Sequence, residues 1–343
     1  MDWGLGHTTR CIPIIRYLLK NGHRVTLAGN EVQKKVLGEE FPDLPCLFLK
    51  GYQVRYSKTA RYLPWQMLLQ IPTIANSIRH EHEWLQKMQT QHQFDLIVSD
   101  NRYGLYAKKI PSVILTHQTR IQIPQSRWLE KQVSRMTHRL LRHFREVWIP
   151  DYTDHRLSGR LSENSLPSVR YLGLLSRIEY QHFKSFYIKY LFILSGPEPQ
   201  RSLLEEIILN LDTGDHSVVL IRGVPGASSP IEKSNWTILN HCPASSMQEF
   251  LIQAETVICR SGYSSLMDLC ALGKKAVLIP TPGQTEQEYL ARHFAENQRA
   301  VVVMQKNLRS EFRQAVGTLE QLPEAVAEQP VLNRILDDFF EKF

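Results

Sequence analysis

A short turn near the carboxyl end of the chain carries residue types suited to binding a phosphate and a ribose. Ser261 and Gly262 directly follow the apolar run 257–259, and a helical pattern begins right after them. The first amides of a helix have no partner inside it and lie at its positive end, so this turn is typical of a phosphate site. Ser264 and Asp268, four residues apart, share one helix face. The spacing predicts a hydroxyl near a diphosphate and a carboxylate that accepts ribose hydroxyls. The alternative is an ordinary helix cap with a solvated Asp268.

The next turn, at 280–287, is a second polar segment at the start of a helix. It follows the apolar run 276–279 and contains Gln284, Glu286 and Gln287. These side chains can hydrogen-bond the hydroxyls of a sugar, although polar residues are also ordinary turn chemistry. Because parallel strands end at the same edge of a sheet, the two turns together predict a ligand crevice at that edge.

The pattern of apolar runs predicts the elements that position these turns. Strand-length runs alternate with helical stretches of ten or more residues, which implies right-handed crossovers and parallel sheets covered on both faces. The expected strands lie at 25–28, 46–49, 96–98, 113–115, 147–149, 190–194, 218–221, 237–239, 257–259, 276–279 and 300–303. The expected helices include 12–19, 30–39, 64–90, 126–145 and 201–211, one that begins at about 263, and a closing one near 331–340.

Two successive halves of this kind join near residue 175. The sequence therefore predicts an α/β protein with two doubly wound, Rossmann-like domains that face each other across a cleft. We place these domains at 1–175 and 176–326, followed by a closing helix over 327–343. Only three residues precede Gly4 in the first glycine turn. A buried strand normally stands there, so we expect the first strand of the amino-terminal domain to be missing and the native product to begin upstream.

Composition narrows the classes of function and partner. The 343 residues are 43% hydrophobic and 22% charged, which excludes a disordered tail, a fibre or a coiled-coil rod. The formal charge of +7 fits an anionic substrate, an anionic membrane or a nucleic acid. Five scattered cysteines without metal-ligand spacing argue against disulfides and a zinc site, and favour a reducing, cytoplasmic compartment. No apolar run approaches the ~20 residues that span a bilayer.

Two stretches carry a resemblance to a known family. RSGYSSLMDLCALGKKAVLIPTPGQTEQEYLA, at 260–291, resembles the donor-binding signature of family 28 glycosyltransferases, and GLGHTTRCIPIIRYLLKNGHRVTLAG, at 4–29, resembles the glycine loop and first helix of their acceptor half. Members of this family include the N-acetylglucosaminyltransferase of the lipid-linked bacterial cell-wall precursor. The resemblance implies the GT-B fold, with an acceptor-side first domain and a nucleotide-sugar-binding second domain. It also implies inverting transfer of N-acetylglucosamine or another hexose from a UDP-sugar to a hydroxyl of a lipid-linked or glycan acceptor, without a metal or cofactor.

The resemblance also implies roles for particular residues of the second half. Asp268 stands where the family usually has a glutamate that grips the ribose, and it is one methylene shorter. The segment 241–247 corresponds to the loop that reads the base. Arg177, at the link between the halves, is a further candidate to pair with the diphosphate. The other matching donor-binding positions are Ser195 and Gly196 in the glycine-rich turn, Ser261, Gly262 and Ser264 in the diphosphate turn, and Gln284, Glu286 and Gln287 in the sugar loop.

The glycine loop of the first half is the predicted catalytic position. His7 is our candidate base, because an imidazole with a pKa near ~6.5 can take a proton from an acceptor hydroxyl or stabilise the leaving phosphate. Gly4 and Gly6 flank it on the acceptor side. Asp100 and His117, each at the end of an apolar strand, are rivals for the base or for contact with the acceptor.

A membrane surface is a further candidate partner. The stretch 127–148 pairs an apolar stripe with the basic residues Arg127, Lys131, Arg135 and Arg139, and the stretch 62–71 is rich in apolar residues. A basic amphipathic helix lies on an anionic bilayer or packs into a core with a solvated basic face. With a lipid-linked acceptor, both stretches would place the protein peripherally on the inner face of the cell membrane.

Two other functions remain open at this point. A nucleotide-sugar epimerase can share the fold, but the sequence lacks recognisable paired acidic and basic residues for that chemistry. A non-catalytic basic module that binds membranes or nucleic acid is the second, although no aromatic-basic motif supports nucleic acid, and we do not expect it as a partner.

Overall fold

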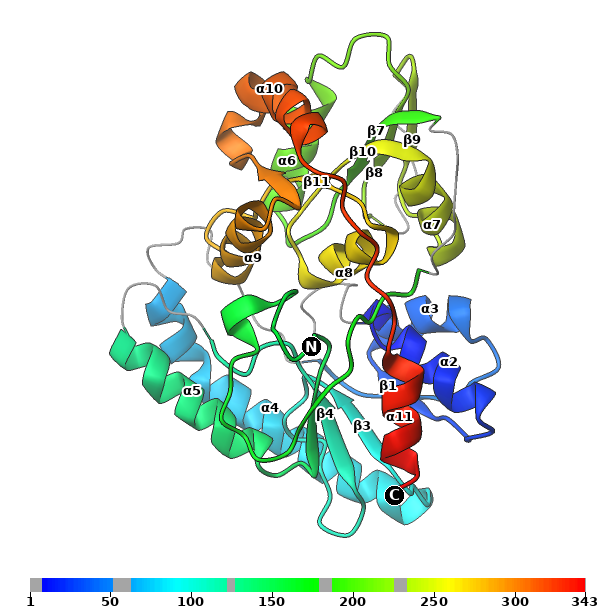
Figure 1. Ribbon diagram of the computed structural model, residues 1–343. Helices are drawn as coiled ribbons and strands as arrows, with labels where there is room; N and C mark the ends of the chain where they lie inside the picture. The colour runs from blue at the N-terminus through cyan, green and yellow to red at the C-terminus, as the bar shows by residue number, and fades with distance from the viewer. Residues whose placement is uncertain (1–7, 52–62, 122–126, 179–186, 225–232, 343) are drawn as a thin grey trace. The chain divides into compact units, whose positions relative to one another are not determined.

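The computed structural model describes residues 8–51, 63–121, 127–178, 187–224 and 233–342 (Figure 1). The chain forms two compact units: unit 1 comprises the residues up to Leu175 together with those from Pro330 onward, and unit 2 runs from Ser176 to Gln329. The closing segment is therefore part of unit 1 rather than an appendage of unit 2. The expectation about a first strand falls on residues outside the described ranges.

Unit 1 consists of parallel strands that alternate with helices. One sheet pairs β1 (Leu27–Gly29) with β2 (Cys46–Phe48), and a second has the order β3 (Ile97–Asp100), β4 (Ser112–Leu115), β5 (Glu146–Ile149) and β6 (Val169–Tyr171). The helices are α2 (Ile12–Lys20), α3 (Glu31–Glu40), α4 (Leu63–Gln91), α5 (Arg127–Leu141) and α11 (Leu332–Phe340), with a 3-10 turn η2 (Gly159–Leu161). Strand β6 has no signal in the sequence, because its three half-buried residues, one of them an arginine, form no apolar run.

Local sequence explains the first elements of unit 1. A capping box begins α3, since the Asn30 side chain accepts a hydrogen bond from the Gln33 amide and the Gln33 side chain accepts one from the Asn30 amide. The buried residues Ile12, Ile15, Leu27 and Leu37 then form one cluster between α2, α3 and β1. These contacts fix the start of α2, and Arg10 lies two residues before it.

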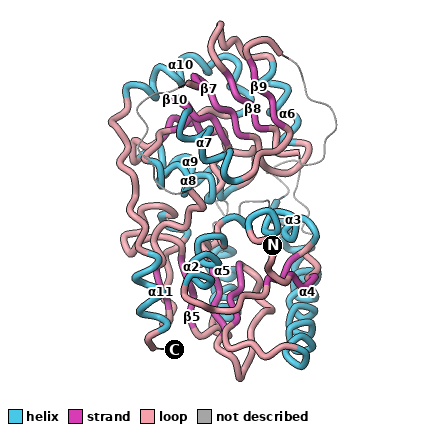
Figure 2. The backbone as a smooth tube through the Cα atoms, turned by 90° about the vertical axis from the view of Figure 1, so that its right-hand side faces the viewer, coloured by secondary structure: helices cyan, strands magenta, loops and turns pink. Residues whose placement is uncertain are grey.

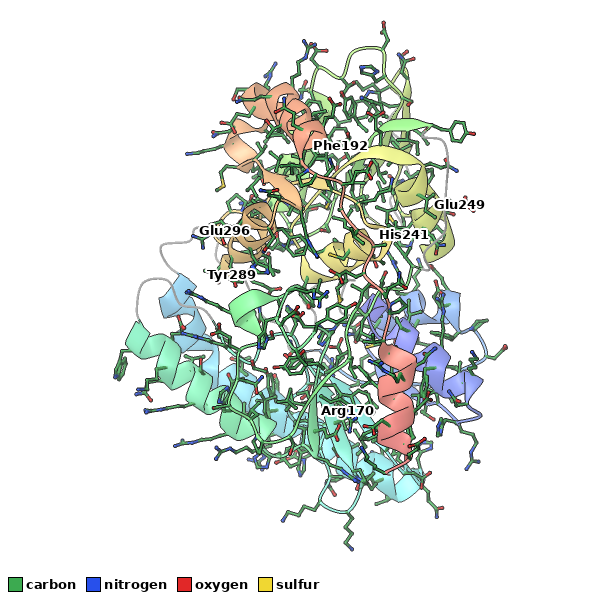
Figure 3. The ribbon with its side chains drawn as sticks, in the orientation of Figure 1. Arg170, Phe192, His241, Glu249, Tyr289 and Glu296 are labelled. Carbon is green, nitrogen blue, oxygen red and sulfur yellow. The ribbon has the colours of Figure 1, made fainter. Side chains whose placement is uncertain are left out.

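The carboxyl-terminal helix α11 docks onto unit 1 through polar and aromatic contacts, and Figure 1 shows it beside α2. Arg170 on β6, labelled in Figure 3, donates hydrogen bonds to Glu146 at 2.7 Å and to Asp338 at 2.8 Å. The Tyr17 hydroxyl donates to Asp337 at 2.6 Å, and the Phe339 ring packs edge-on against Trp148. Helix α11 thereby ties α2 to the far strands of the second sheet.

Unit 2 has one parallel sheet of six strands, whose central strands run side by side in Figure 2. The strand order is β12 (Ala300–Val302), β11 (Ala276–Leu278), β10 (Ala254–Cys259), β7 (Ile188–Ile193), β8 (Val218–Ile221) and β9 (Trp236–Leu239). The helices are α6 (Gln200–Leu209), α7 (Ala244–Gln253), α8 (Tyr263–Leu272), α9 (Thr285–Glu296) and α10 (Leu308–Gln321), with a 3-10 turn η3 (Gln305–Asn307).

Alternate side chains of the central strands pack against different helices. Phe192 on β7 belongs to a large buried cluster with residues of α6 and α10. The neighbouring Ile193 instead lines a small pocket with Met247 of α7 and Leu269 of α8. The sheet is therefore covered on both faces, as the near-continuous apolar strands of the sequence predict.

Candidate functional site

Three strand-to-helix turns lie next to one another at the carboxyl edge of the unit 2 sheet. They connect β7 to α6, β10 to α8 and β11 to α9, and their strands are neighbours in the order β11, β10, β7. Ser195 and Gly196 of the first turn are exposed, and Gly196 has φ +103°, a conformation that favours glycine. A Cβ atom built on Gly262 in the second turn would meet no atom of the described residues within 4 Å. The edge of the sheet is thus open to a ligand at Gly262.

The three helices that follow these turns differ in how their positive ends are neutralised. At α6, Glu198 accepts a hydrogen bond from the Ser202 amide at 3.3 Å. At α9, Glu286 and Glu288 stand in the first turn. The first turn of α8 has no acidic residue, and its N-cap is Gly262, which has no capping side chain. Of these three amino termini, that of α8 is therefore the one where an anion gains most from the helix dipole.

Two of the predicted donor-binding side chains brace these turns from within. The buried Ser261 hydroxyl donates to the Gln287 carbonyl at 2.8 Å, and the Gln287 side chain accepts a hydrogen bond from the Thr281 amide at 2.9 Å. Gln284 and Glu286 are half-buried at the start of α9. A direct contact of Ser261 or Gln287 with a ligand stays a prediction, whereas their role in holding the β10 and β11 turns together is visible.

Asp268 lies one helical turn beyond Ser264, as its spacing predicts, but its carboxylate is engaged within unit 2. It accepts a hydrogen bond from Ser176 at 2.7 Å and lies 3.6 Å from the Arg177 guanidinium. Burial raises the pKa of Asp268, while Arg177 and Ser176 act in the opposite direction. Ser176 and Arg177 thus contact the carboxylate that is predicted to bind the ribose. That Arg177 pairs with a diphosphate stays a prediction.

The predicted base-reading loop approaches the same carboxylate. His241, labelled in Figure 3, is half-buried in the turn between β9 and α7. Met247, at the end of that segment, lines a pocket of about 30 Å³ together with Arg177 and Asp268. A pocket of this size has room for about one water molecule. The 241–247 loop and Asp268 therefore share a wall of unit 2 even though they are far apart in the sequence.

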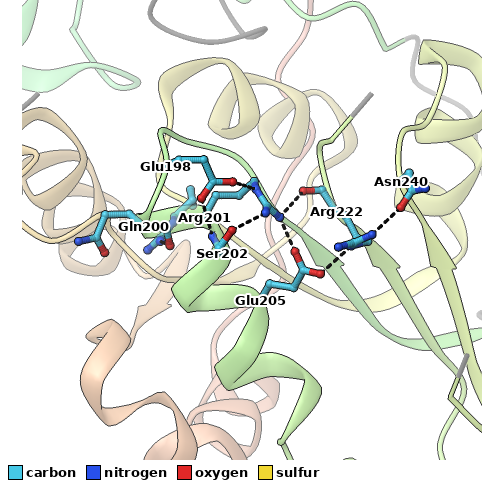
Figure 4. Close-up of polar contacts among 8 residues, drawn as sticks. Glu198, Gln200, Arg201, Ser202, Glu205, Arg222 and Asn240 are labelled. Atoms are coloured by element: carbon cyan, nitrogen blue, oxygen red, sulfur yellow. Dashed lines mark hydrogen bonds and ion pairs between the residues drawn. The ribbon is translucent and has the colours of Figure 1, made fainter. Parts of the chain in front are cut away.

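A network of paired charges next to this edge was not foreseen from the sequence (Figure 4). The buried Glu205 of α6 accepts hydrogen bonds from both Arg201 and Arg222, the latter at 2.6 Å. Arg222 also donates to Asn240 at 2.7 Å, and Arg201 donates to Glu198 at 2.6 Å. The network joins the turns after β7, β8 and β9. Its only signal in the sequence is a polar residue, Arg222 or Asn240, directly after each of two apolar runs.

In unit 1, the carboxyl ends of β3 and β4 meet at a buried arginine. Arg10 donates to Asp100 at 3.0 Å through Nε and to His117 Nδ1 at 2.8 Å. Since a guanidinium only donates, Nδ1 is the acceptor and the imidazole proton of the neutral ring is on Nε2. In this arrangement His117 has no free nitrogen lone pair to act as a base. Asp100 and His117, predicted as rivals, thus belong to one cluster organised by Arg10.

The remaining sequence predictions for unit 1 have different outcomes. His7, Gly4 and Gly6 lie outside the described residues. On α5, Lys131, Arg135 and Arg139 are exposed together with Met136 and Trp128, while Leu141 is buried. The side chains of the 62–71 stretch lie outside the described part. In the described ranges no helix is long and apolar enough to cross a membrane, and no group of three His, Cys, Asp or Glu residues could hold a metal ion.

Comparison with known proteins agrees with this geometry. The model of the glycosyltransferase family 28 C-terminal domain matches residues 232–332, which contain both the α8 and the α9 turns. Over this part of its length the chain is similar to family 28 glycosyltransferases. The match therefore covers the base-reading loop, the diphosphate turn and the sugar loop predicted from the sequence.

Two relatives and one solved structure extend the comparison. An N-acetylglucosamine transferase of Desulforudis audaxviator, named for UDP-N-acetylglucosamine and pyrophosphoryl-undecaprenol, is 33% identical over 97 residues, which are 24% of this chain and 26% of that protein. An uncharacterized glycosyltransferase of Methanosarcina acetivorans is 23% identical over 321 residues, which cover 83% of this chain and 79% of that protein.

The structure of the kitacinnamycin glycosyltransferase has a TM-score of 0.65 at 14% identity and covers 98% of this chain and 91% of the other. The predicted GT-B fold is confirmed.

Proposed function

We propose that the chain is an inverting, metal-independent glycosyltransferase that transfers a sugar from a UDP-sugar to a hydroxyl of a lipid-linked or glycan acceptor. The observation that carries this proposal is the turn at Gly262. It combines an uncapped helix terminus, no acidic residue in the first turn of α8 and open space at the glycine. A diphosphate bound there gains charge stabilisation in the ground state and more as it leaves, because negative charge develops on it during transfer.

The rest of the donor is accounted for by neighbouring residues of unit 2. The ribose would contact Asp268, the base would contact the 241–247 loop, and the sugar would extend toward Gln284 and Glu286. The Asp268 carboxylate accepts one hydrogen bond from Ser176 at Oδ1 and has further lone pairs with which to accept bonds from the ribose hydroxyls. The catalytic base would be His7, for which the glycine-loop resemblance is the support.

A lipid-linked acceptor would also explain why α5 exposes both basic and apolar side chains. Its exposed Lys131, Arg135 and Arg139 would attract anionic headgroups, at about 1 kcal/mol for each basic residue near the surface. Exposed Trp128 and Met136 would add apolar contact with the bilayer. The protein would then act peripherally on the inner face of the cell membrane, in the cytoplasm.

Calorimetry with nucleotides tests the donor assignment. We expect wild-type protein to bind UDP-sugars more tightly than GDP-sugars or TDP-sugars. The Asp268→Ala variant should lose affinity for UDP but keep its affinity for 2′,3′-dideoxy-UDP, because only the first ligand has the hydroxyls that the carboxylate accepts. Equal affinities of wild-type and variant proteins for UDP would refute the ribose contact. Absence of nucleotide-sugar binding by the wild type would refute the proposed function.

A further inference from the structure

Arg260 is a buried cation that no carboxylate of the described residues neutralises. It is fully buried at the end of β10, immediately before the Gly262 turn. One terminal nitrogen donates to the carbonyls of Ile279 at 3.1 Å and Pro280 at 3.2 Å. The other donates to the Gln200 carbonyl at 2.9 Å and to the Gln305 side chain at 2.7 Å. All four partners are uncharged oxygens.

Two further observations concern buried polar groups near Arg260 that make no hydrogen bond with the described residues. Within the described ranges, Arg260 Nε is buried without a hydrogen-bond partner, and so is the hydroxyl of Thr281, the residue after Pro280. That hydroxyl is 3.6 Å from the position that a Cβ atom on Gly196 would take. Native proteins rarely leave such groups unsatisfied, because each one costs free energy.

The charge on Arg260 persists at neutral pH. Burial lowers the pKa of the guanidinium to about 10, so the group is still protonated there. Charges in a protein interior are weakly screened, and their effect extends beyond hydrogen-bond distance. A buried charge without a partner is ordinarily strongly destabilising, so its retention calls for a counter-charge.

We infer that the counter-charge of Arg260 is the diphosphate of the ligand, so that Arg260 acts through space as a positioning and charge-stabilising residue beneath the α8 terminus. This inference rests on the proposed function and adds a residue to its diphosphate site. The guanidinium links the starts of α6 and α8 to the end of β11, and carbonyl dipoles alone hold it. Its charge is therefore available to an anion bound at the Gly262 turn. Without a ligand, the Arg260 charge has no carboxylate of the described residues to neutralise it. An anion that binds at the turn is therefore attracted to this charge, and the attraction adds to its binding free energy.

Calorimetry with UDP, uridine and inorganic pyrophosphate separates this role from a structural one. We expect Arg260→Gln to weaken the binding of UDP and pyrophosphate on the order of tenfold while the affinity for uridine stays unchanged. Arg260→Lys should restore most of the loss because it keeps the charge. Parallel losses for UDP and uridine would identify Arg260 as purely structural and overturn the inference.

A second variant tests the charge balance with Arg260 intact. Gln305→Glu places a carboxylate on the guanidinium with almost no change in shape. It should raise the melting temperature of the empty protein and weaken pyrophosphate binding. Arg313→Gln, which alters a solvent-exposed pair with Asp212, is the matched control and should change neither.

The two proposals can fail separately. Unchanged pyrophosphate affinity in Gln305→Glu, or no pyrophosphate binding by the wild type, would overturn the inference about Arg260. Pyrophosphate binding that depends on Arg260, without binding of any nucleotide sugar, would support the inference and refute the proposed donor.

Discussion

Each of the two units buries an arginine at the carboxyl edge of a parallel sheet, but the partners of the two guanidinium groups differ. In unit 1, Arg10 is 1% exposed and pairs with Asp100, with His117 as a second acceptor. In unit 2, Arg260 is 0% exposed and meets carbonyl and amide oxygens. The first charge is neutralised inside the fold, whereas the second is left for a ligand. The comparison suggests that unit 1 is preorganised by an internal ion pair and that unit 2 is completed by its anion.

The largest expected effect comes from breaking the internal pair. Arg10→Gln removes the cation that pairs with Asp100 at a buried site, so we expect the free energy of unfolding to fall by about 3–5 kcal/mol. Chemical denaturation measures this loss. Arg313→Gln, in an exposed pair, should change stability by less than about 1 kcal/mol. Equal losses in the two variants would show that Arg10 and Asp100 are not a structural pair.

A glycine in unit 1 should show the next largest effect. A Cβ atom on Gly104 would lie 2.2 Å from the Ile78 carbonyl oxygen and 2.6 Å from the Glu81 Cβ. The backbone must move to admit it, and we expect Gly104→Ala to cost roughly 1–3 kcal/mol in stability. Thermal unfolding of the purified variant checks this value. An unchanged melting temperature would mean that α4 moves aside freely.

The matched glycine in unit 2 should show the opposite behaviour. Gly262→Ala adds a methyl group at φ −73° without a clash with the described residues, so only the lower N-cap preference of alanine should reduce stability, by about 1 kcal/mol or less. The methyl group takes up space where the diphosphate would approach, so pyrophosphate binding should weaken. Titration of both glycine variants with pyrophosphate measures this difference in affinity between Gly104→Ala and Gly262→Ala. Unaltered pyrophosphate affinity in Gly262→Ala would move the anion site elsewhere.

The smallest expected effect is a pH dependence at Asp268. Because its pKa is raised in the folded state, the stability it contributes is present below the ordinary aspartate pKa and is lost as pH rises through the raised value. The melting temperature of wild type relative to Asp268→Asn should therefore fall as the pH rises above the ordinary aspartate pKa of about 4. Ser176→Ala, which removes a group that lowers the pKa, should extend this fall to higher pH. A difference that does not vary with pH would contradict the buried position of the carboxylate.

Local patterns predicted most of the elements, because alternating apolar runs and caps act over a few residues. The turn at Ser261 and Gly262 could be placed at a strand-to-helix boundary for the same reason. The partners of the site residues could not be predicted. Arg10 meets Asp100 and His117 across 90 and 107 residues, and Ser176 meets Asp268 across 92. Only the folded chain brings these side chains together.

Helix α11 makes unit 2 an insertion within the sequence of unit 1. During synthesis, all residues of unit 2 leave the ribosome before the segment from Pro330 onward that completes unit 1. Until that segment emerges, Tyr17 and Arg170 lack their acidic partners on α11, and Trp148 lacks the Phe339 ring. Unit 1 begins to be translated before unit 2, but its set of contacts is completed only after unit 2 has been synthesised.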